Sequence, residues 1–496
     1  MISGSNISRA LGILIAVPAS LIIAFWVMTN PTGAISGLSK LLTITIAFIA
    51  LVNPKRGLIF IIPQILYTDE IKRLAVYYGA VSYSTVYEVL LGPIISILML
   101  NAGYLAGVVF GRYSLSKNWV LATLLIGVIC VAIAGTTTGG IATRAQAALN
   151  IGLYMTFIPL MGVLINDAQE ARQMMKVQLW MALPSIAWGI QQYYNGFSPL
   201  EYGYARTGLS PVHFAQLFGY EKPRPFGFFG SATGYSCVGI YGALSLYFTL
   251  KGGKINLLFL LVTLVYLMGI FVYKARGCTL IIPIIFFGAW CFNGRIRTLG
   301  YYVTVGSLLF SGIIFAEKLL YVGLNKINQA IAVNTDWGRE VLNVSTFSDR
   351  LKGWILLGKP STYSPFGRLF EKGEEGRIVG QNDADFHHDI ITSIVLETGV
   401  VGLLLTVGIG AFFLFKTHSY LLRIQSPARR WEASMFLACG FTVSVISITT
   451  GNIFTTVPLN FAIWTAFGSF AVLCKENEAL LLEEKVEPVI VPATAR

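Results

Sequence analysis

Long apolar runs alternate with short polar segments along most of this chain, and many of the runs approach the length that a helix needs to cross a bilayer. We predict membrane-spanning helices at 10–28, 37–53, 57–67, 82–111, 119–134, 149–165, 177–194, 234–250, 255–273, 279–292, 298–315, 390–415, 432–450 and 453–473. The sequence therefore predicts an all-α polytopic membrane protein with about fourteen transmembrane helices. The segment 57–67 crosses only if it extends into its flanks, and a re-entrant segment is the alternative.

One long polar segment, 316–389, interrupts this pattern before the third-last predicted helix. It separates residues 1–315, which hold transmembrane helices 1–11 and a polar segment at 195–233, from residues 390–473, which hold helices 12–14. We expect 316–389 to form a large, partly helical loop outside the cytoplasm. Residues 474–496 turn polar, and they are predicted to form a disordered cytoplasmic tail.

Composition and charge agree with a membrane protein. Hydrophobic residues make up 55% of the chain and charged residues 12%, against about a quarter charged in soluble domains. The net charge of +12 does not require a nucleic-acid partner, and we expect none, because cytoplasmic loops of membrane proteins collect Lys and Arg. With the N-terminus inside, the basic loops are cytoplasmic and 316–389 is outside. Lys72 and Arg73 also fall outside and are the exceptions.

The predicted outer loop ends in a polar run that contains two adjacent histidines, His387 and His388, followed by Asp389. An imidazole takes up and releases a proton near neutral pH, so either histidine is a candidate general base. Asp389 could fix the tautomer of a neighbouring ring or cap the following helix. A purely interfacial helix cap is one alternative, and a metal site that also uses Asp383 and Asp385 is another. The spacing matches no standard metal motif, so we expect no metal.

Two arginines lie on the same predicted outer side. Arg224 precedes the Gly-rich run Pro225-Phe-Gly-Phe-Phe-Gly, in which backbone N–H groups could converge on an anion beside the guanidinium. Arg276 lies in the short polar turn 273–277 between two apolar runs. We predict that both bind a diphosphate and stabilise it as a leaving group. Snorkelling to lipid phosphates is the alternative.

Several of these motifs, in this order, resemble the O-antigen ligase/polymerase superfamily. They are Arg350-x-x-x-Trp354, then His388, then Glu397-x-Gly399-x-x-Gly402, together with the arginine segments around 224 and 276. The resemblance covers roughly residues 220–405. The chain departs from the family pattern at Asp389, where the family usually has Asn, and in having two adjacent histidines. Counting back from Glu397 favours His388, and His387 stays an alternative.

The resemblance implies a glycosyltransferase of the GT-C type in the bacterial inner membrane, multi-pass, with its active site on the periplasmic side. It implies an undecaprenyl-diphosphate-linked oligosaccharide as donor, a glycan as acceptor, and no metal or other cofactor. By carry-over, His388 or His387 would be the base, Arg224 and Arg276 would bind the diphosphate, and Arg350 would support the loop or the leaving group. Inversion at the anomeric carbon is expected.

Three functions are consistent with these motifs. A polymerase of lipid-linked repeat units is favoured, and a ligase that transfers the glycan to lipid A core or to protein uses the same donor chemistry. A transporter of lipid-linked glycans is the third, for which Glu88 would be the main intramembrane ionisable residue. The expected partners are the lipid-linked donor, the glycan acceptor, membrane lipids and, as a further candidate, a chain-length regulator.

Overall fold

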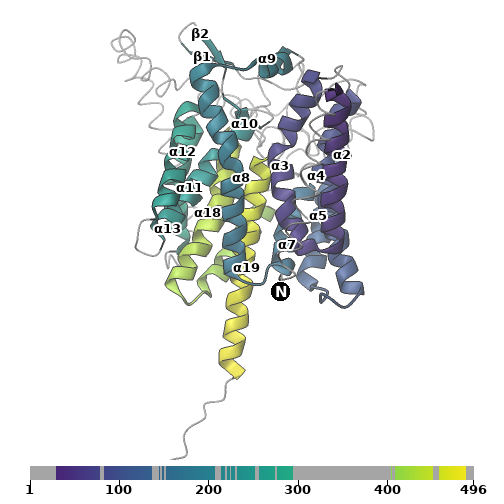
Figure 1. Cartoon of the computed structure of the whole chain (residues 1–496). Coiled ribbons are helices and arrows are strands. Elements are labelled where there is room, and N and C mark those ends of the chain that lie inside the picture. The colour runs from purple at the N-terminus through teal and green to yellow at the C-terminus, as the bar shows by residue number, and fades with distance from the viewer. Residues whose placement is uncertain are drawn as a thin grey trace, which may run out of the picture.

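The structure is a computed structural model of the chain, and it describes residues 29–78, 83–136, 145, 148–149, 152–206, 214–217, 220–223, 225–229, 232–251, 256–273, 276–293, 404, 408–450 and 457–486. These residues form a bundle of helices that run up and down between two ends (Figure 1). The predicted helices 10–28 and 298–315 lie outside the described residues, as do the loop 316–389 and most of the predicted helix 390–415.

The described part is helical, as the apolar runs predict, apart from one short hairpin. Its helices are α2 (Pro31–Val52), α3 (Pro54–Tyr78), α4 (Tyr83–Val109), α5 (Lys117–Thr136), α7 (Phe157–Leu164), α8 (Ala168–Asn195), α9 (Pro199–Arg206), α10 (Ala232–Tyr235), α11 (Val238–Leu250), α12 (Leu257–Tyr273), α13 (Arg276–Asn293), α18 (Pro427–Thr450) and α19 (Leu459–Val486). The hairpin pairs β1 (Phe214–Leu217) with β2 (Tyr220–Pro223) in antiparallel register, Leu217 opposite Tyr220. It lies in the segment 195–233, which the sequence predicts only as a polar loop.

The two ends of the bundle differ in what they carry. The upper end in Figure 1 holds the end of α8 together with α9, the hairpin and α10, and α19 extends beyond the lower end. The lower end collects basic residues from the starts of α3, α5, α8 and α18 and from the ends of α4 and α11. Among them are Lys55, Arg56, Arg112, Lys117, Arg172, Lys176, Lys251, Arg429 and Arg430. These are residues that the charge pattern predicts to be cytoplasmic.

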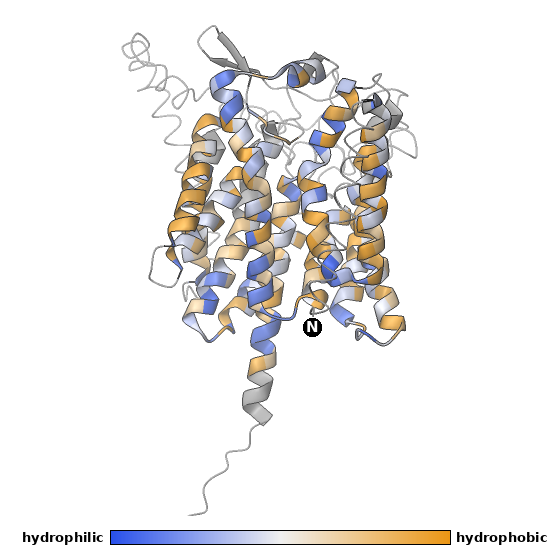
Figure 2. Cartoon of the chain, in the orientation of Figure 1, coloured by the Kyte–Doolittle hydropathy of each residue, from blue (hydrophilic) through white to orange (hydrophobic). Residues whose placement is uncertain are grey.

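The helices at the two margins of the view, α12 and α2, are mostly apolar between their ends (Figure 2). Large side chains such as Ile44, Phe48 and Leu121 are 64–70% exposed, which is unfavourable for a surface that faces water. Two helical stretches, Gly33–Val52 and Val89–Val109, are long and apolar enough to cross a membrane, and the described part also contains shorter apolar helices, Leu257–Tyr273 among them. The described residues therefore agree with a membrane protein, by length and composition.

Helix α3 is longer than the predicted segment 57–67. It runs without a break from Pro54 to Tyr78 and contains Pro63 in its interior. It packs against α2, α4 and α8, so the short apolar run does extend into its flanks, which is the condition for a crossing segment. The sequence pattern failed here because the polar residues in the last turns of α3 face protein rather than lipid.

The predicted disordered tail is also wrong in its first half, because α19 continues as a helix to Val486. The segment after Lys475 is rich in Glu and Leu, which favour helix. Tertiary contacts hold its start: Glu476 Oε2 accepts a hydrogen bond from the backbone N–H of Ala168 at 3.0 Å, and Asn477 Nδ2 donates to the carbonyl of Arg423 at 3.2 Å. Residues 487–496 lie outside the described residues.

A buried carboxylate joins three helices near the lower end. Glu432 of α18 is 1% exposed and accepts from Arg172 Nε and Nη2 of α8 at 2.6 and 2.7 Å. Lys251, at the end of α11, donates to the same carboxylate at 2.7 Å. Burial lowers the pKa of the Lys251 ammonium, and the contact with Glu432 opposes that shift. The cluster fixes how α8, α11 and α18 sit together.

Candidate functional site at the upper end of the bundle

The upper end contains a polar network built around residues 225–229, which we call the 225–229 turn. The turn follows directly after the position of Arg224 and precedes α10. Side chains from α3 and α8 hold it from two sides. The turn contacts α3 at Arg73 and α8 at Ser185 and Gln192, so it lies beside the last turns of both helices, in the same half of the bundle as α10 (Figure 1).

Arg73 of α3 holds the turn from one side. Its side chain is fully buried, Nη1 donates to the carbonyl oxygen of Gly227 at 3.0 Å, and Nη2 donates to that of Phe229 at 2.6 Å. The guanidinium carbon lies 4.6 Å from the centre of the Phe226 ring, and Glu70 Oε2 lies 3.1 Å from Nη1. A buried cation needs such partners, because an unpaired charge away from water is strongly unfavourable.

Gln192 of α8 holds the same turn from the other side. Its Oε1 accepts from the backbone N–H groups of Phe226 and Gly227 at 3.0 and 2.9 Å. Ser185, two helical turns earlier, accepts from the N–H of Phe228 at 2.8 Å. Three successive N–H groups of the turn are thus bonded to side chains, and the N–H of Phe229 donates to the carbonyl of Phe226 at 3.0 Å. Buried backbone groups need such partners.

The backbone at Gly227 requires a glycine. Its φ is +58°, in the left-handed region. A Cβ atom built at this position would lie 2.3 Å from the carbonyl oxygen of Ser185 and 2.6 Å from its Oγ. The turn therefore approaches α8 as closely as backbone atoms permit, and this approach is what lets Ser185 and Gln192 reach it.

A second buried carboxylate secures α9 above α8. Glu201 is 1% exposed, and it accepts from Trp188 Nε1 at 2.7 Å, from the N–H of Ser198 at 2.6 Å and from Gln192 Nε2. The Trp188 ring stacks on Phe228 of the turn, with centroids 5.7 Å apart. The turn, α8 and α9 therefore form one connected unit.

Lys72, the neighbour of Arg73, is buried as well. It forms an ion pair with Asp69 at 2.6 Å, and its Nζ lies 5.6 Å from the centre of the Tyr204 ring of α9. The two cations that are exceptions to the predicted charge asymmetry therefore both have protein partners. In the sequence, the only sign of these two residues was that they break the predicted charge asymmetry. A cation on the disfavoured side of a membrane needs a specific reason to be there.

The structure describes the segments next to the two arginines that were predicted to bind a diphosphate. Arg224 lies outside the described residues, between the end of β2 and the 225–229 turn. Arg276 begins α13, and its side chain lies outside the described part. A series of rings connects the two segments: Phe229 lies 6.2 Å from Tyr235, and Tyr235 lies 5.5 Å from Tyr273, the last residue of α12.

The remaining predicted site residues, His387, His388 and Arg350, lie outside the described residues. That they lie near the polar network around the 225–229 turn thus stays a prediction. The same holds for Asp383, Asp385 and Asp389 as alternative metal ligands. Among the residues that the structure describes, no group of three or more His, Cys, Asp or Glu side chains is placed to hold a metal ion.

Comparison with known proteins gave no match to a family model, to a curated protein or to a solved structure. The resemblance to the O-antigen ligase/polymerase superfamily therefore rests on the motifs alone.

Proposed function

We propose that this chain is a multi-pass glycosyltransferase of the bacterial inner membrane, with about fourteen transmembrane helices. It joins oligosaccharide repeat units that are carried on undecaprenyl diphosphate, and it works on the periplasmic side. The observation that supports this best is the two-sided attachment of the 225–229 turn, by Arg73 and by Gln192, directly after Arg224. A segment fixed this firmly beside a predicted anion-binding arginine suits a preorganised site.

The chemistry of the proposed reaction explains why fixed cations are needed. A sugar hydroxyl attacks the anomeric carbon, the bond to the diphosphate oxygen breaks, and negative charge develops on the departing diphosphate. Guanidinium groups that are already in position stabilise this charge without reorganising. In the proposal Arg224 and Arg276 supply them, and the ring series from Phe229 to Tyr273 keeps their two segments at the same end of the bundle.

The other half of the proposal concerns the acceptor. A sugar hydroxyl is a weak nucleophile, so a base that removes its proton accelerates the attack. His388 fills this role, with His387 as the alternative, and Arg350 supports the loop or the leaving group. Attack from the face opposite the diphosphate inverts the anomeric carbon.

A complementation experiment tests the proposal. In a strain that lacks the native gene, the wild-type chain should restore a long surface glycan, whereas Arg224→Ala, Arg276→Ala and His388→Ala should each reduce it by at least about a hundredfold, as expected for loss of a transition-state contact or a base. Arg423→Ala is the matched control, because Arg423 is an exposed cation at the opposite end of the bundle.

Membrane insertion and thermal stability of each variant must match the wild type for the result to count. Full glycan assembly in Arg224→Ala together with the His387→Ala, His388→Ala double variant would overturn the proposal. The glycan of the deletion strain separates the two transferase types. A single repeat unit on lipid A core indicates a polymerase, and long carrier-linked chains with none on the core indicate a ligase.

A further inference from the structure

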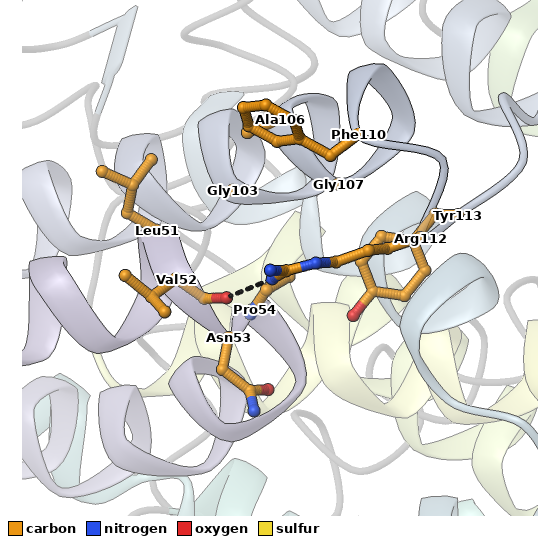
Figure 3. Close-up of a pocket in the computed structure, with 10 residues that line it drawn as sticks. All are labelled: Leu51, Val52, Asn53, Pro54, Gly103, Ala106, Gly107, Phe110, Arg112 and Tyr113. Atoms are coloured by element: carbon orange, nitrogen blue, oxygen red, sulfur yellow. Dashed lines mark hydrogen bonds between the residues drawn. The ribbon is translucent and has the colours of Figure 1, made fainter.

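A cavity of about 470 Å³ opens at the lower end of the bundle, far from the 225–229 turn (Figure 3). It lies between the end of α2, the start of α3 and the end of α4. Its polar lining side chains are Asn53, Arg112 and Tyr113, and its apolar lining includes Leu51, Ala106 and Phe110. No residue in this lining is acidic. A cavity of this size accommodates a small polar headgroup.

The end of α4 directs Arg112 across this cavity. Gly111 has φ of +71°, Arg112 N–H donates to the carbonyl of Gly107 at 2.7 Å, and Gly111 N–H donates to that of Val108 at 3.1 Å. This is a Schellman motif, which ends a helix at a left-handed glycine and reverses the chain. The reversal brings Arg112 Nη1 to 3.4 Å from the carbonyl oxygen of Val52, the last residue of α2.

Two glycines of α4 determine the shape of the cavity. A Cβ atom at Gly103 would lie 2.3 Å from the carbonyl oxygen of Ala50, and one at Gly107 would lie 2.3 Å from the Tyr113 ring. Helix α4 therefore crosses the last turn of α2 at backbone contact distance, and the Tyr113 ring rests directly on α4. The cavity opens beside this contact, where the two helices end.

The position of the cavity along the bundle is informative. The two stretches that are long and apolar enough to cross a membrane, Gly33–Val52 and Val89–Val109, both end at it. Just above, Val109 and Phe110 are 81% and 76% exposed, and Val52 is half exposed. Arg112, which follows at once, is exposed too. Apolar surface that gives way to an exposed cation within a few residues marks the headgroup level of a bilayer.

We propose that this cavity binds one anionic phospholipid of the inner leaflet. Its phosphate pairs with the Arg112 guanidinium, its headgroup enters the cavity beside Asn53 and Tyr113, and its acyl chains cover Phe110 and Leu51. Charge complementarity selects the occupant, since the site offers a cation and an apolar wall and its lining offers no carboxylate. The site is independent of the proposed glycosyl transfer, which lies at the other end of the bundle.

Lipid retention by the purified full-length protein tests this proposal. The protein is reconstituted in nanodiscs that contain equal amounts of phosphatidylglycerol and phosphatidylcholine and then extracted into detergent, and co-purifying lipids are counted by native mass spectrometry. The wild type should retain about one phosphatidylglycerol and little phosphatidylcholine. Arg112→Gln should weaken retention by about tenfold, the loss expected for one charge-assisted contact.

Two further variants distinguish lipid binding in the cavity from non-specific attraction of anionic lipid to the basic end of the protein. Ala106→Leu keeps Arg112 but fills the cavity, so it should also release the lipid. Arg423→Gln removes an exposed cation at the same end that does not line the cavity, and it should retain lipid as the wild type does. Unchanged retention in Arg112→Gln, or an equal loss in Arg423→Gln, overturns the proposal. A monodisperse elution profile confirms that each variant is folded.

Discussion

Arg73 donates a hydrogen bond to the backbone carbonyl of Gly227, a residue 154 positions further along the chain. The bond links the last part of α3 to the turn that follows Arg224, and both residues are buried. In a bundle of apolar helices, a buried cation that binds backbone carbonyls determines where a loop sits. Several measurable consequences follow from this relationship and from the contacts around it.

Replacing Arg73 by Gln should destabilise the protein by about 3 kcal/mol, because Glu70 and two carbonyl groups lose their cationic partner in a buried place. Arg73→Lys keeps the charge but not the planar fork, so it should recover only part of the loss. The measurement is thermal unfolding of the purified protein in detergent, with Arg423→Gln as control. Equal melting temperatures for all three variants would contradict the structure at this point.

Three glycine-to-alanine substitutions should rank in a definite order. Gly227→Ala combines a left-handed backbone with a clash against Ser185, and it should lose the most stability, about 2–4 kcal/mol. Gly196→Ala has φ of +80° but open space around it, so it should lose about 1 kcal/mol. Gly127→Ala, inside α5 with no atom in the way, should be neutral or slightly stabilising. Thermal unfolding of the three variants gives the order, and an equal effect of the first two would argue against the close approach to α8.

Glu432→Gln should destabilise the lower end, since it removes the charge that compensates Arg172 and Lys251. We expect a loss of about 2–3 kcal/mol, reduced because both cations are partly exposed to water. A double-mutant cycle with Arg172→Gln should show strong coupling. Additive losses in the cycle would mean that the two side chains do not act as a pair.

Cysteine labelling tests the orientation of the bundle. In a background without native cysteines, Tyr202→Cys in α9 should react with a membrane-impermeant maleimide added to intact spheroplasts, whereas Leu480→Cys in α19 should react only after the membrane is opened. Both positions are exposed in the structure, 47% and 39% respectively, so a lack of access cannot explain a difference. The opposite labelling pattern would place the 225–229 turn in the cytoplasm and remove the basis for the proposed function.

A chelator should leave glycan synthesis intact, because the proposed reaction relies on guanidinium groups rather than on a divalent ion. The assay is polymer formation by the reconstituted protein with a lipid-linked donor, before and after treatment with EDTA. Loss of activity that a single added divalent ion restores would favour the metal alternative built from Asp383, Asp385, Asp389 and the neighbouring histidines.

The sequence by itself determined the helical class and indicated that most basic residues gather at one end of the bundle. Both depend on local composition: an apolar run must satisfy its backbone hydrogen bonds internally, whatever lies beside it, and so it forms a helix. Arg73 drew attention only as an exception to the charge pattern. Nothing in the sequence indicated that Gln192 and Ser185 would bind the turn after Arg224.

Tertiary structure decided the features that depend on partners distant in the chain. Helix α3 extends to Tyr78 because its polar end is buried against α8 and α9, and α19 continues past Lys475 because Ala168 and Arg423 meet its side chains. The cavity at Arg112 exists because two glycines let α4 cross α2 closely. Hydropathy is a property of successive residues, whereas the pairing of buried polar groups depends on which helices become neighbours, and only the folded bundle specifies that.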